Sequence, residues 1–197
     1  MHISLAGRLG SGKSTLAKIF CPKYGFEHYY TGAIMRALAE ERGMSALEFN
    51  QMCENDPSAD LMIDNKTTEV SRARKDDKIL FDSRMAWHFA EKSFKVYLYV
   101  PIEVSVKRIL GDGTRGNVEE YADAADAEAK ILARMQSESL RYKEFYGVDN
   151  HDLNNYDLIL CTSHISPEEA ADTIGNEFNE YLKNPEGYPK SKKLYME

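Results

Sequence analysis

A glycine-rich segment near the start of the chain most constrains what this sequence can fold into. Residues 7–15 read Gly-Arg-Leu-Gly-Ser-Gly-Lys-Ser-Thr and match the pattern G-x-x-x-x-G-K-[ST]. The apolar residues 3–6 precede the segment, and a helical pattern follows it from Lys13 to about residue 20. Glycines allow such a loop to curl until its backbone N–H groups point at phosphate oxygens. The sequence therefore predicts a phosphate-binding loop (P-loop) between a strand and a helix.

This loop predicts a site for a nucleoside triphosphate and Mg²⁺. We expect Lys13 to reach the β- and γ-phosphates and Ser14 to bind the metal, while the N-terminus of the following helix attracts the anion. The predicted nucleotide-binding residues are Gly7, Gly10, Ser11, Gly12, Lys13, Ser14 and Thr15. A GTPase is not indicated. Asn65-Lys-Thr-Thr68 lacks the final Asp of a guanine-reading motif, and Asp172-Thr-Ile-Gly175 falls inside a helical pattern.

Composition and charge narrow the class of protein further. The net charge of −7 argues against a general nucleic-acid binder, so a local group of cations must attract an anionic nucleotide. No apolar run approaches the roughly 20 residues of a membrane span. Because the first residues read as a strand, we expect no signal or transit peptide. Cys21, Cys53 and Cys161 are too widely spaced to indicate a disulfide framework or a metal site. We expect a cytoplasmic protein whose partners are small molecules, with neither a nucleic-acid polymer nor a membrane among them.

Short strand-like runs alternate with helical patterns along the chain. The predicted strands cover residues 2–6, 26–30, 78–82, 95–100 and 157–162. This alternation predicts a parallel sheet covered by helices on both faces, an α/β fold. Two helices have clear starts, since Ser45-Ala-Leu-Glu48 and Ser166-Pro-Glu-Glu169 both read as capping boxes.

Two stretches are longer than connections between strands require. Residues 31–77 form a helical insertion that we expect to bind a substrate. The second stretch combines a glycine-rich loop, residues 111–116, with a helical pattern from about residue 118 to 146. Two insertions that flank a P-loop core indicate a kinase that closes over two nucleotides. The polar residues 183–197 contain prolines and a glycine, and predict a loose tail.

Charged residues at the ends of these elements are candidates for the chemistry. Asp82 ends the third predicted strand, where it can hold Mg²⁺ beside the P-loop; it could equally cap the next helix, and the two roles are compatible. Phosphoryl transfer moves negative charge, so its catalysis depends on positioning and on cations. The candidate arginines are Arg36, Arg84, Arg108, Arg115, Arg134 and Arg141.

Ordinary structural roles remain open for several of these arginines. Arg134 and Arg141 share one helix face because of their spacing of seven residues. Glu138 lies between them at helical contact spacing, so ordinary surface ion pairs are an alternative for both arginines. Arg115, in the glycine-rich loop, could be a solvated residue or could act in closure of the site.

Further motifs accompany the P-loop. They are Tyr30-Thr-Gly-Ala-Ile-Met-Arg36, Glu41-Arg-Gly-Met-Ser-Ala-Leu-Glu-Phe49, Ile79-Leu-Phe-Asp-Ser-Arg84, Arg141-Tyr-Lys-Glu-Phe-Tyr-Gly-Val-Asp149 and Tyr156-Asp-Leu-Ile-Leu-Cys-Thr-Ser163. In this order they resemble the cytidylate kinase-like family of nucleoside monophosphate kinases, particularly its short archaeal-type form. The resemblance runs from residue 1 to about residue 175.

The resemblance implies a reaction and a division of the chain. The reaction is ATP + CMP (or dCMP) ⇌ ADP + CDP (or dCDP), with Mg²⁺. The implied fold is the three-layer P-loop NTPase fold with a five-stranded parallel sheet. A single kinase domain would span residues 1–182, with a monophosphate-binding insert at about 31–77 and a mobile lid at about 111–146. Residues 183–197 would form the polar tail.

By motif, the resemblance also assigns residues to the two substrates. The implied acceptor-binding residues are Thr31, Gly32, Arg36, Asp60, Asp64 and Arg84. The implied catalytic residues are Lys13, Asp82, Arg84, Arg134 and Arg141. Ser14 and Asp82 would hold the metal, and Arg108 would pack on the adenine of ATP. Asp60 and Asp64 would read the cytosine amino group, with a solvated helix face as the alternative.

The sequence departs from the family pattern near the acceptor. Ala33 stands where the family usually has Asp or Glu, and Ser83-Arg-Met-Ala-Trp87 replaces a more usual Gly-Arg-Leu-x-Gly-Trp. These changes remove no phosphate-handling group, but they leave the acceptor base open. UMP, AMP or a metabolite is therefore an alternative acceptor, and a non-catalytic nucleotide-binding regulator is an alternative function.

Overall fold

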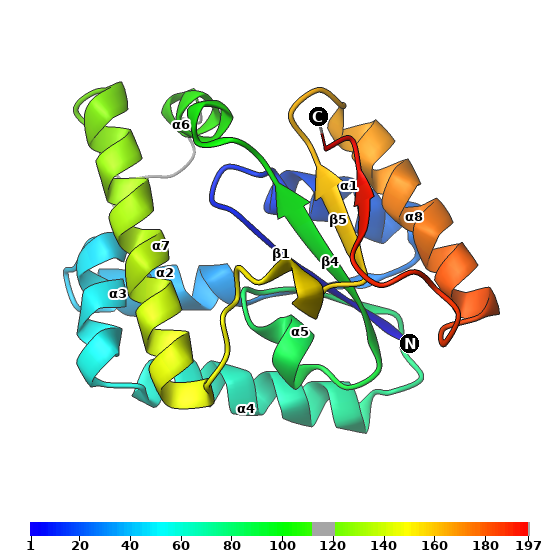
Figure 1. The fold of residues 1–197 in the computed structure, drawn as a ribbon. Coiled ribbons are helices and arrows are strands. Elements are labelled where there is room, and N and C mark those ends of the chain that lie inside the picture. The colour runs from blue at the N-terminus through cyan, green and yellow to red at the C-terminus, as the bar shows by residue number, and fades with distance from the viewer. Residues whose placement is uncertain (112–120, 197) are drawn as a thin grey trace.

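Parallel strands form the centre of the molecule, and helices cover both faces of the sheet (Figure 1). The computed structural model describes residues 1–111 and 121–196. The strands are β1 (His2–Gly7), β2 (Glu27–Tyr30), β3 (Ile79–Asp82), β4 (Ser93–Tyr99), β5 (Leu158–Cys161) and β6 (Lys192–Leu194). Their order in the sheet is β2-β3-β1-β4-β5-β6, and every neighbouring pair is parallel. The predicted α/β class is therefore confirmed.

The helices divide between the faces of the sheet and its edge. They are α1 (Lys13–Tyr24), α2 (Thr31–Glu41), α3 (Ala46–Asn55), α4 (Ser58–Ala73), α5 (Ala86–Phe89), α6 (Ile102–Leu110), α7 (Ala124–Tyr146) and α8 (Pro167–Lys183). A 3₁₀ turn, Leu153–Asn155, precedes β5. Figure 1 shows α2, α3 and α7 gathered on one side of the sheet, away from α8. Among the described residues, none of these helices is long and apolar enough to cross a lipid bilayer.

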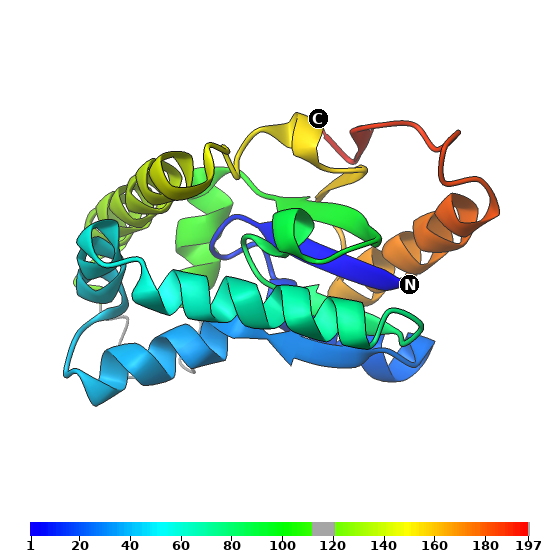
Figure 2. The same cartoon turned by 90° about the horizontal axis from the view of Figure 1, so that it is seen from below.

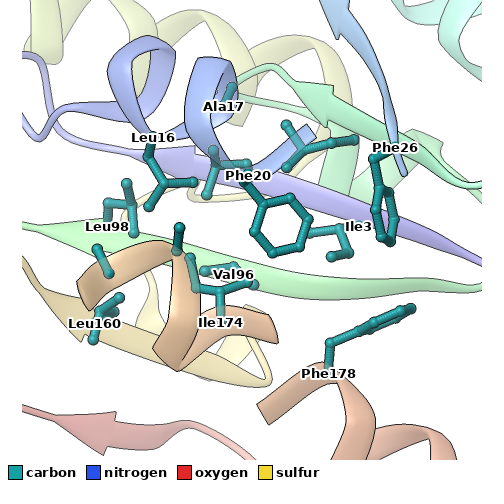
Figure 3. Packing of buried hydrophobic residues seen from close by; sticks show 14 of the residues in the cluster. Ile3, Leu16, Ala17, Phe20, Phe26, Val96, Leu98, Leu160, Ile174 and Phe178 are labelled. Atoms are coloured by element: carbon teal, nitrogen blue, oxygen red, sulfur yellow. The ribbon is translucent and has the colours of Figure 1, made fainter. Parts of the chain in front are cut away.

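The larger core lies between the sheet and helices α1 and α8 (Figure 3). Leu16 and Phe20 of α1 meet Ile174 and Phe178 of α8 over the inward side chains of β1 and β4. Alternate residues of β1 point to opposite faces, so Ile3 and Leu5 join this core while Ala6 faces the other side. Burial on both faces explains why β1 reads as a continuous apolar run.

The opposite face packs against α4, α5 and the turn before β5. Trp87 of α5 lies against Tyr97 and Tyr156 in one cluster, and Val70 of α4 packs against Phe81 in another. Seen from below, α4 runs beneath the sheet (Figure 2). This packing anchors the far end of the 31–77 insertion to the core, so the insertion is folded against the sheet rather than separate from it.

Local sequence signals set the ends of several helices. Both predicted capping boxes are present: Ser45 accepts a hydrogen bond from the Glu48 amide, and Ser166 accepts one from the Glu169 amide. Gly147 ends α7 in the left-handed conformation, with φ of 69°. The helix begins at Ala124 rather than near residue 118 because Asp123 caps it by accepting from the amide of Asp126. Residues 112–120, including Arg115, lie outside the described residues.

The sheet has one strand more than predicted, because the C-terminal segment adds β6. Residues 192–194 pair with β5 in parallel register. Tyr188, just before this strand, stacks edge-on against Phe94 with ring centroids 5.5 Å apart, and its hydroxyl donates to Glu177. Lys192 forms an ion pair with the same glutamate at 2.7 Å. The expectation of five strands and a loose tail was therefore wrong. Polar composition concealed a segment that is held by backbone pairing with β5, by aromatic contacts of Tyr188 and by the ion pair with Glu177.

We predict that Tyr188→Ala destabilises the fold by about 2 kcal/mol, because it removes a half-buried aromatic side chain from the α8 face. The measurement is urea unfolding followed by circular dichroism. Tyr195→Ala is the matched control, since that tyrosine is 53% exposed. Equal stability of the two variants would contradict the docking of the tail.

Candidate active site

A cavity of about 510 Å³ opens at the carboxyl ends of β1, β2 and β3. This is where parallel α/β sheets bind ligands, and the volume suits small-molecule substrates. The P-loop forms one wall, and the 31–77 insertion and α7 form the others. The candidate site residues among its lining are Gly10, Gly12, Lys13, Ser14, Thr15, Thr31, Gly32, Arg36, Asp60, Asp64, Asp82, Arg84, Arg134 and Arg141.

The P-loop has the backbone conformation that its glycines predict. Gly10 and Gly12 have φ of +74° and +86°, a region that other residues rarely adopt. A Cβ at Gly10 would also lie 2.8 Å from the hydroxyl of Ser105 on α6, so the loop packs tightly on this helix. Lys13 turns back over the loop, and its ammonium donates to the carbonyls of Gly7 and Arg8 at 2.9 and 3.2 Å. The lysine is thus held at the mouth of the loop.

Asp82 lies beside the first residues of α1. Its carboxylate is 2% exposed and accepts a hydrogen bond from the Ser14 hydroxyl at 3.2 Å. His28 lies 3.4 Å from the same oxygen. Thr31 donates to the Asp82 carbonyl at 3.2 Å, which ties the start of α2 to the end of β3. Asp82 does not cap α5, whose first turn has no side-chain cap.

Two arginines reach the cavity from the 31–77 insertion and from the end of β3. The Arg36 guanidinium donates to the Tyr30 hydroxyl and lies 5.2 Å from that ring's centroid, so the tyrosine fixes its direction. Arg84 follows β3, and its Nη1 donates to the carbonyl of Gly7 at 3.3 Å. The Arg84 side chain is 18% exposed and therefore faces the cavity rather than bulk water.

Glu138 on α7 binds two of the candidate arginines at once. Its carboxylate lies 2.5 Å from Arg84 Nε and 3.1 Å from Arg134 Nε, and the residue is 2% exposed. Burial alone would raise the pKa of Glu138, but Arg84 and then Arg134 outweigh it and lower the pKa to about 2. The hypothesis of ordinary surface ion pairs is therefore wrong for Glu138, because tertiary packing buries this face of α7.

Arg141 has different partners from Arg134, although both lie on α7. It forms an ion pair with Asp60 of α4 and donates to the backbone carbonyl of Asn50 on α3 at 2.9 Å. Arg141 is 1% exposed, and Asp60 is 5% exposed. The solvated-face alternative for Asp60 is thus wrong. The pair joins α7 to the insertion across the cavity wall.

Asp64 lies one helical turn beyond Asp60 and is also buried. Tyr146 of α7 donates to its carboxylate at 2.7 Å. Burial raises the pKa of Asp64 to about 7; the Tyr146 hydrogen bond works in the opposite direction. Asp60 adds a nearby negative charge that also favours the protonated form. Asp64 therefore changes charge near neutral pH.

Other candidates lie outside the cavity lining. Arg108 donates to the hydroxyl of Thr162 at 3.0 Å and to the carbonyl of Gly10 at 3.4 Å, so it lies behind the P-loop. Gly7 and Ser11 are buried in the turn itself. The packing of Arg108 on the adenine of ATP, which the resemblance implies, stays a prediction.

Sequence reasoning missed several residues that complete the cavity. They include Lys18, His28, Tyr30, Asn50, Tyr142 and Glu138 in its buried role. Tyr30 and Tyr142 lie inside the motifs quoted above. Asn50 carried no local signal, because its contact with Arg141 depends on α3 and α7 meeting in the folded chain. Helical spacing pointed to Glu138 as a partner of Arg134, but not to its burial or to its contact with Arg84.

A P-loop facing a cation-lined cavity on a parallel sheet defines the chain as a P-loop kinase by class. The solved shikimate kinase from Bacteroides thetaiotaomicron shares this fold, with a TM-score of 0.59 and 16% identity, over 93% of this chain and 98% of that one. The sequence supports a narrower statement. The chain belongs to the cytidylate kinase-like family, whose model matches residues 2–164.

Curated relatives agree with this family. The cytidylate kinase of Methanococcoides burtonii is 34% identical over 83% of this chain and 88% of its own length. The cytidylate kinase of Methanosarcina mazei is 38% identical over 88% of this chain and 94% of its own length. The predicted class of enzyme, a phosphotransferase of the nucleoside monophosphate kinase type, is confirmed.

We predict that Asp64 titrates near pH 7 in the folded protein, which ¹³C NMR of the aspartate carboxyls can measure. Because folding raises this pKa above the roughly 3.9 of an unfolded aspartate, the folded state binds more protons between about pH 4 and 7. Its contribution to stability therefore decreases as the pH rises through that window. Asp64→Asn should remove this decrease.

Exposed Asp76→Asn is the matched control and should leave the pH dependence of urea unfolding as in the unsubstituted protein. Titration of Asp64 near pH 4 would contradict its placement in a desolvated pocket.

Proposed function

We propose that this chain transfers the γ-phosphoryl group of ATP to CMP or dCMP with the help of Mg²⁺. One observation carries the proposal: the P-loop and the arginines of the acceptor side line the same cavity. A donor phosphate on the loop and an acceptor phosphate on Arg36 and Arg84 would therefore meet inside it. The names of the curated relatives support cytidine as the acceptor nucleoside.

The donor end would be built by the P-loop and the start of α1. Backbone N–H groups of the loop and the Lys13 ammonium would bind the β- and γ-phosphates. Arg108 would support the adenine side from behind the loop. We propose that the remaining loop residues also belong to the ATP-binding site; they are Gly7, Gly10, Ser11, Gly12 and Thr15.

The residues beside the loop suit Mg²⁺. Ser14 and Asp82 offer a hydroxyl and a carboxylate that already lie 3.2 Å apart, and hard oxygen ligands are those that this ion prefers. Mg²⁺ is commonly held by one or two protein ligands together with phosphate oxygens and water, and these two residues could provide that number. The metal would neutralise charge on the phosphates.

The acceptor end would be built by the insertion at about residues 31–77. Arg36 and Arg84 would bind the acceptor phosphate, with Thr31 and Gly32 at the turn below it. Asp60 and Asp64 provide carboxyl oxygens that can accept from the cytosine amino group. Both are buried, so an acceptor bound there would be read in a desolvated pocket, where hydrogen bonds discriminate most strongly.

Closure would complete the site. We propose that residues 111–146 act as the lid of a single kinase domain over 1–182, and that Arg134 and Arg141 approach the phosphates from α7. Arg141 would do so as its ion pair with Asp60 opens. Exclusion of water would direct the phosphoryl group to the acceptor rather than to hydrolysis. Small nucleotides are the proposed partners, and the cytoplasm, where they are abundant, is the proposed location.

A screen of acceptors tests this function. ³¹P NMR of the protein with Mg·ATP and one monophosphate at a time should show rapid diphosphate formation with CMP or dCMP. Lys13→Ala should abolish transfer while circular dichroism stays unchanged. Transfer to UMP, AMP or GMP instead would show that the acceptor is that monophosphate and not CMP or dCMP. Failure with every acceptor would favour the non-catalytic alternative.

We predict that Arg36→Ala raises the KM for the acceptor by about 10- to 100-fold, because it removes a charged hydrogen bond to the acceptor phosphate. The KM for ATP should change by less than about two-fold. Steady-state kinetics with each substrate varied in turn makes the measurement. Arg42→Ala, at the exposed end of the same helix, is the control. Equal increases in both KM values would contradict the acceptor role of Arg36.

A further inference from the structure

Glu138 occupies an unusual place for a carboxylate. It lies on the wall of the cavity in the middle of α7, 2% exposed, between two arginines from separate parts of the chain. Burying a charge of this kind is costly unless it is fully compensated. An apolar residue would fill the same wall at lower cost, so the position calls for a role beyond packing.

The contacts of this carboxylate fix the direction of both guanidiniums. Each arginine offers five N–H donors in one plane, and Glu138 takes the Nε donor of Arg84 and that of Arg134. A hydrogen bond at Nε sets how each guanidinium plane is oriented. One terminal nitrogen of Arg84 contacts the carbonyl of Gly7, where the P-loop begins. Glu138 thus connects α7, the end of β3 and the P-loop.

The carboxylate also changes the electrostatics of the cavity wall. Glu138 brings a negative charge next to two cations, Arg84 and Arg134, that line the cavity with it. It therefore lowers the positive potential that an anion in the cavity would meet from these arginines. Further along α7, Arg141 forms a separate ion pair with Asp60 of α4.

We infer that Glu138 is a positioning residue, which orients Arg84 and Arg134 toward the transferred phosphoryl group and limits how tightly the two arginines bind nucleotide phosphates. This inference rests on the proposed function, in that both arginines act on phosphates. It adds a carboxylate that acts through these two arginines. Loss of its charge should then alter binding and turnover in opposite directions.

The experiment compares Glu138→Gln, which removes the charge at constant shape, with Glu138→Asp, which keeps the charge on a shorter side chain. Isothermal titration calorimetry measures the Kd for ADP, and steady-state kinetics measures kcat and the KM for CMP. Glu144→Gln on the exposed face of α7 is the control.

For Glu138→Gln we expect kcat to fall by about 10- to 100-fold, since misplaced phosphate ligands slow transfer. The Kd for ADP should fall by about 3- to 10-fold, because a repelling charge near the phosphates is gone. That tightening should shrink in 0.5 M KCl, where charges are screened. For Glu138→Asp we expect a lower kcat with the Kd for ADP within about two-fold of the unsubstituted protein.

A purely structural role predicts a different pattern. Parallel weakening of ADP binding and kcat in both variants, or loss of the folded state in both, would overturn the inference. Unchanged Kd and kcat would overturn it as well. If the unsubstituted protein transfers no phosphate to any acceptor, the proposed function fails, yet the ADP titration still decides the charge effect of Glu138.

Discussion

The site depends on one electrostatic constraint. Several arginines and a lysine must lie around one cavity although their like charges repel one another. In a chain with a net charge of −7, these cations form the local positive region that a nucleotide requires. Their mutual repulsion is offset by Glu138 and Asp60, both buried and both ion-paired with arginines. Because these pairs run between α7, α4 and the end of β3, the same interactions that balance charge also set where the walls of the cavity lie.

The parts of the fold that follow from local chemistry could be predicted from the sequence. The P-loop needs glycines at positions of positive φ, and the apolar run before it becomes the central strand β1. Capping boxes at Ser45 and Ser166 mark two helices correctly, because each satisfies backbone N–H groups within three residues. The motifs shared with the family pointed to Arg36 and Arg84 as site residues, and in the structure both line the same cavity.

The parts that depend on tertiary contact could not be predicted in this way. Helical spacing placed Glu138 beside Arg134, but it could not show that packing buries this face of α7 or that Arg84 reaches it. Arg141 and Asp60 are far apart in the sequence, and only the packing of α7 on the insertion brings them together. The polar composition of residues 183–197 likewise concealed β6, which the edge of β5 holds by backbone pairing.

The proposed reaction requires two nucleotides to bind end to end in one cavity. A single molecule of P1-(cytidine-5′)-P5-(adenosine-5′) pentaphosphate should then fill both subsites, which isothermal titration calorimetry can measure. We expect one molecule bound per chain, at least about 100-fold more tightly than ADP. Adenosine 5′-pentaphosphate, which lacks the cytidine, should lose most of that gain. Binding of the linked compound no tighter than that of ADP would show that the two subsites do not lie end to end in this cavity.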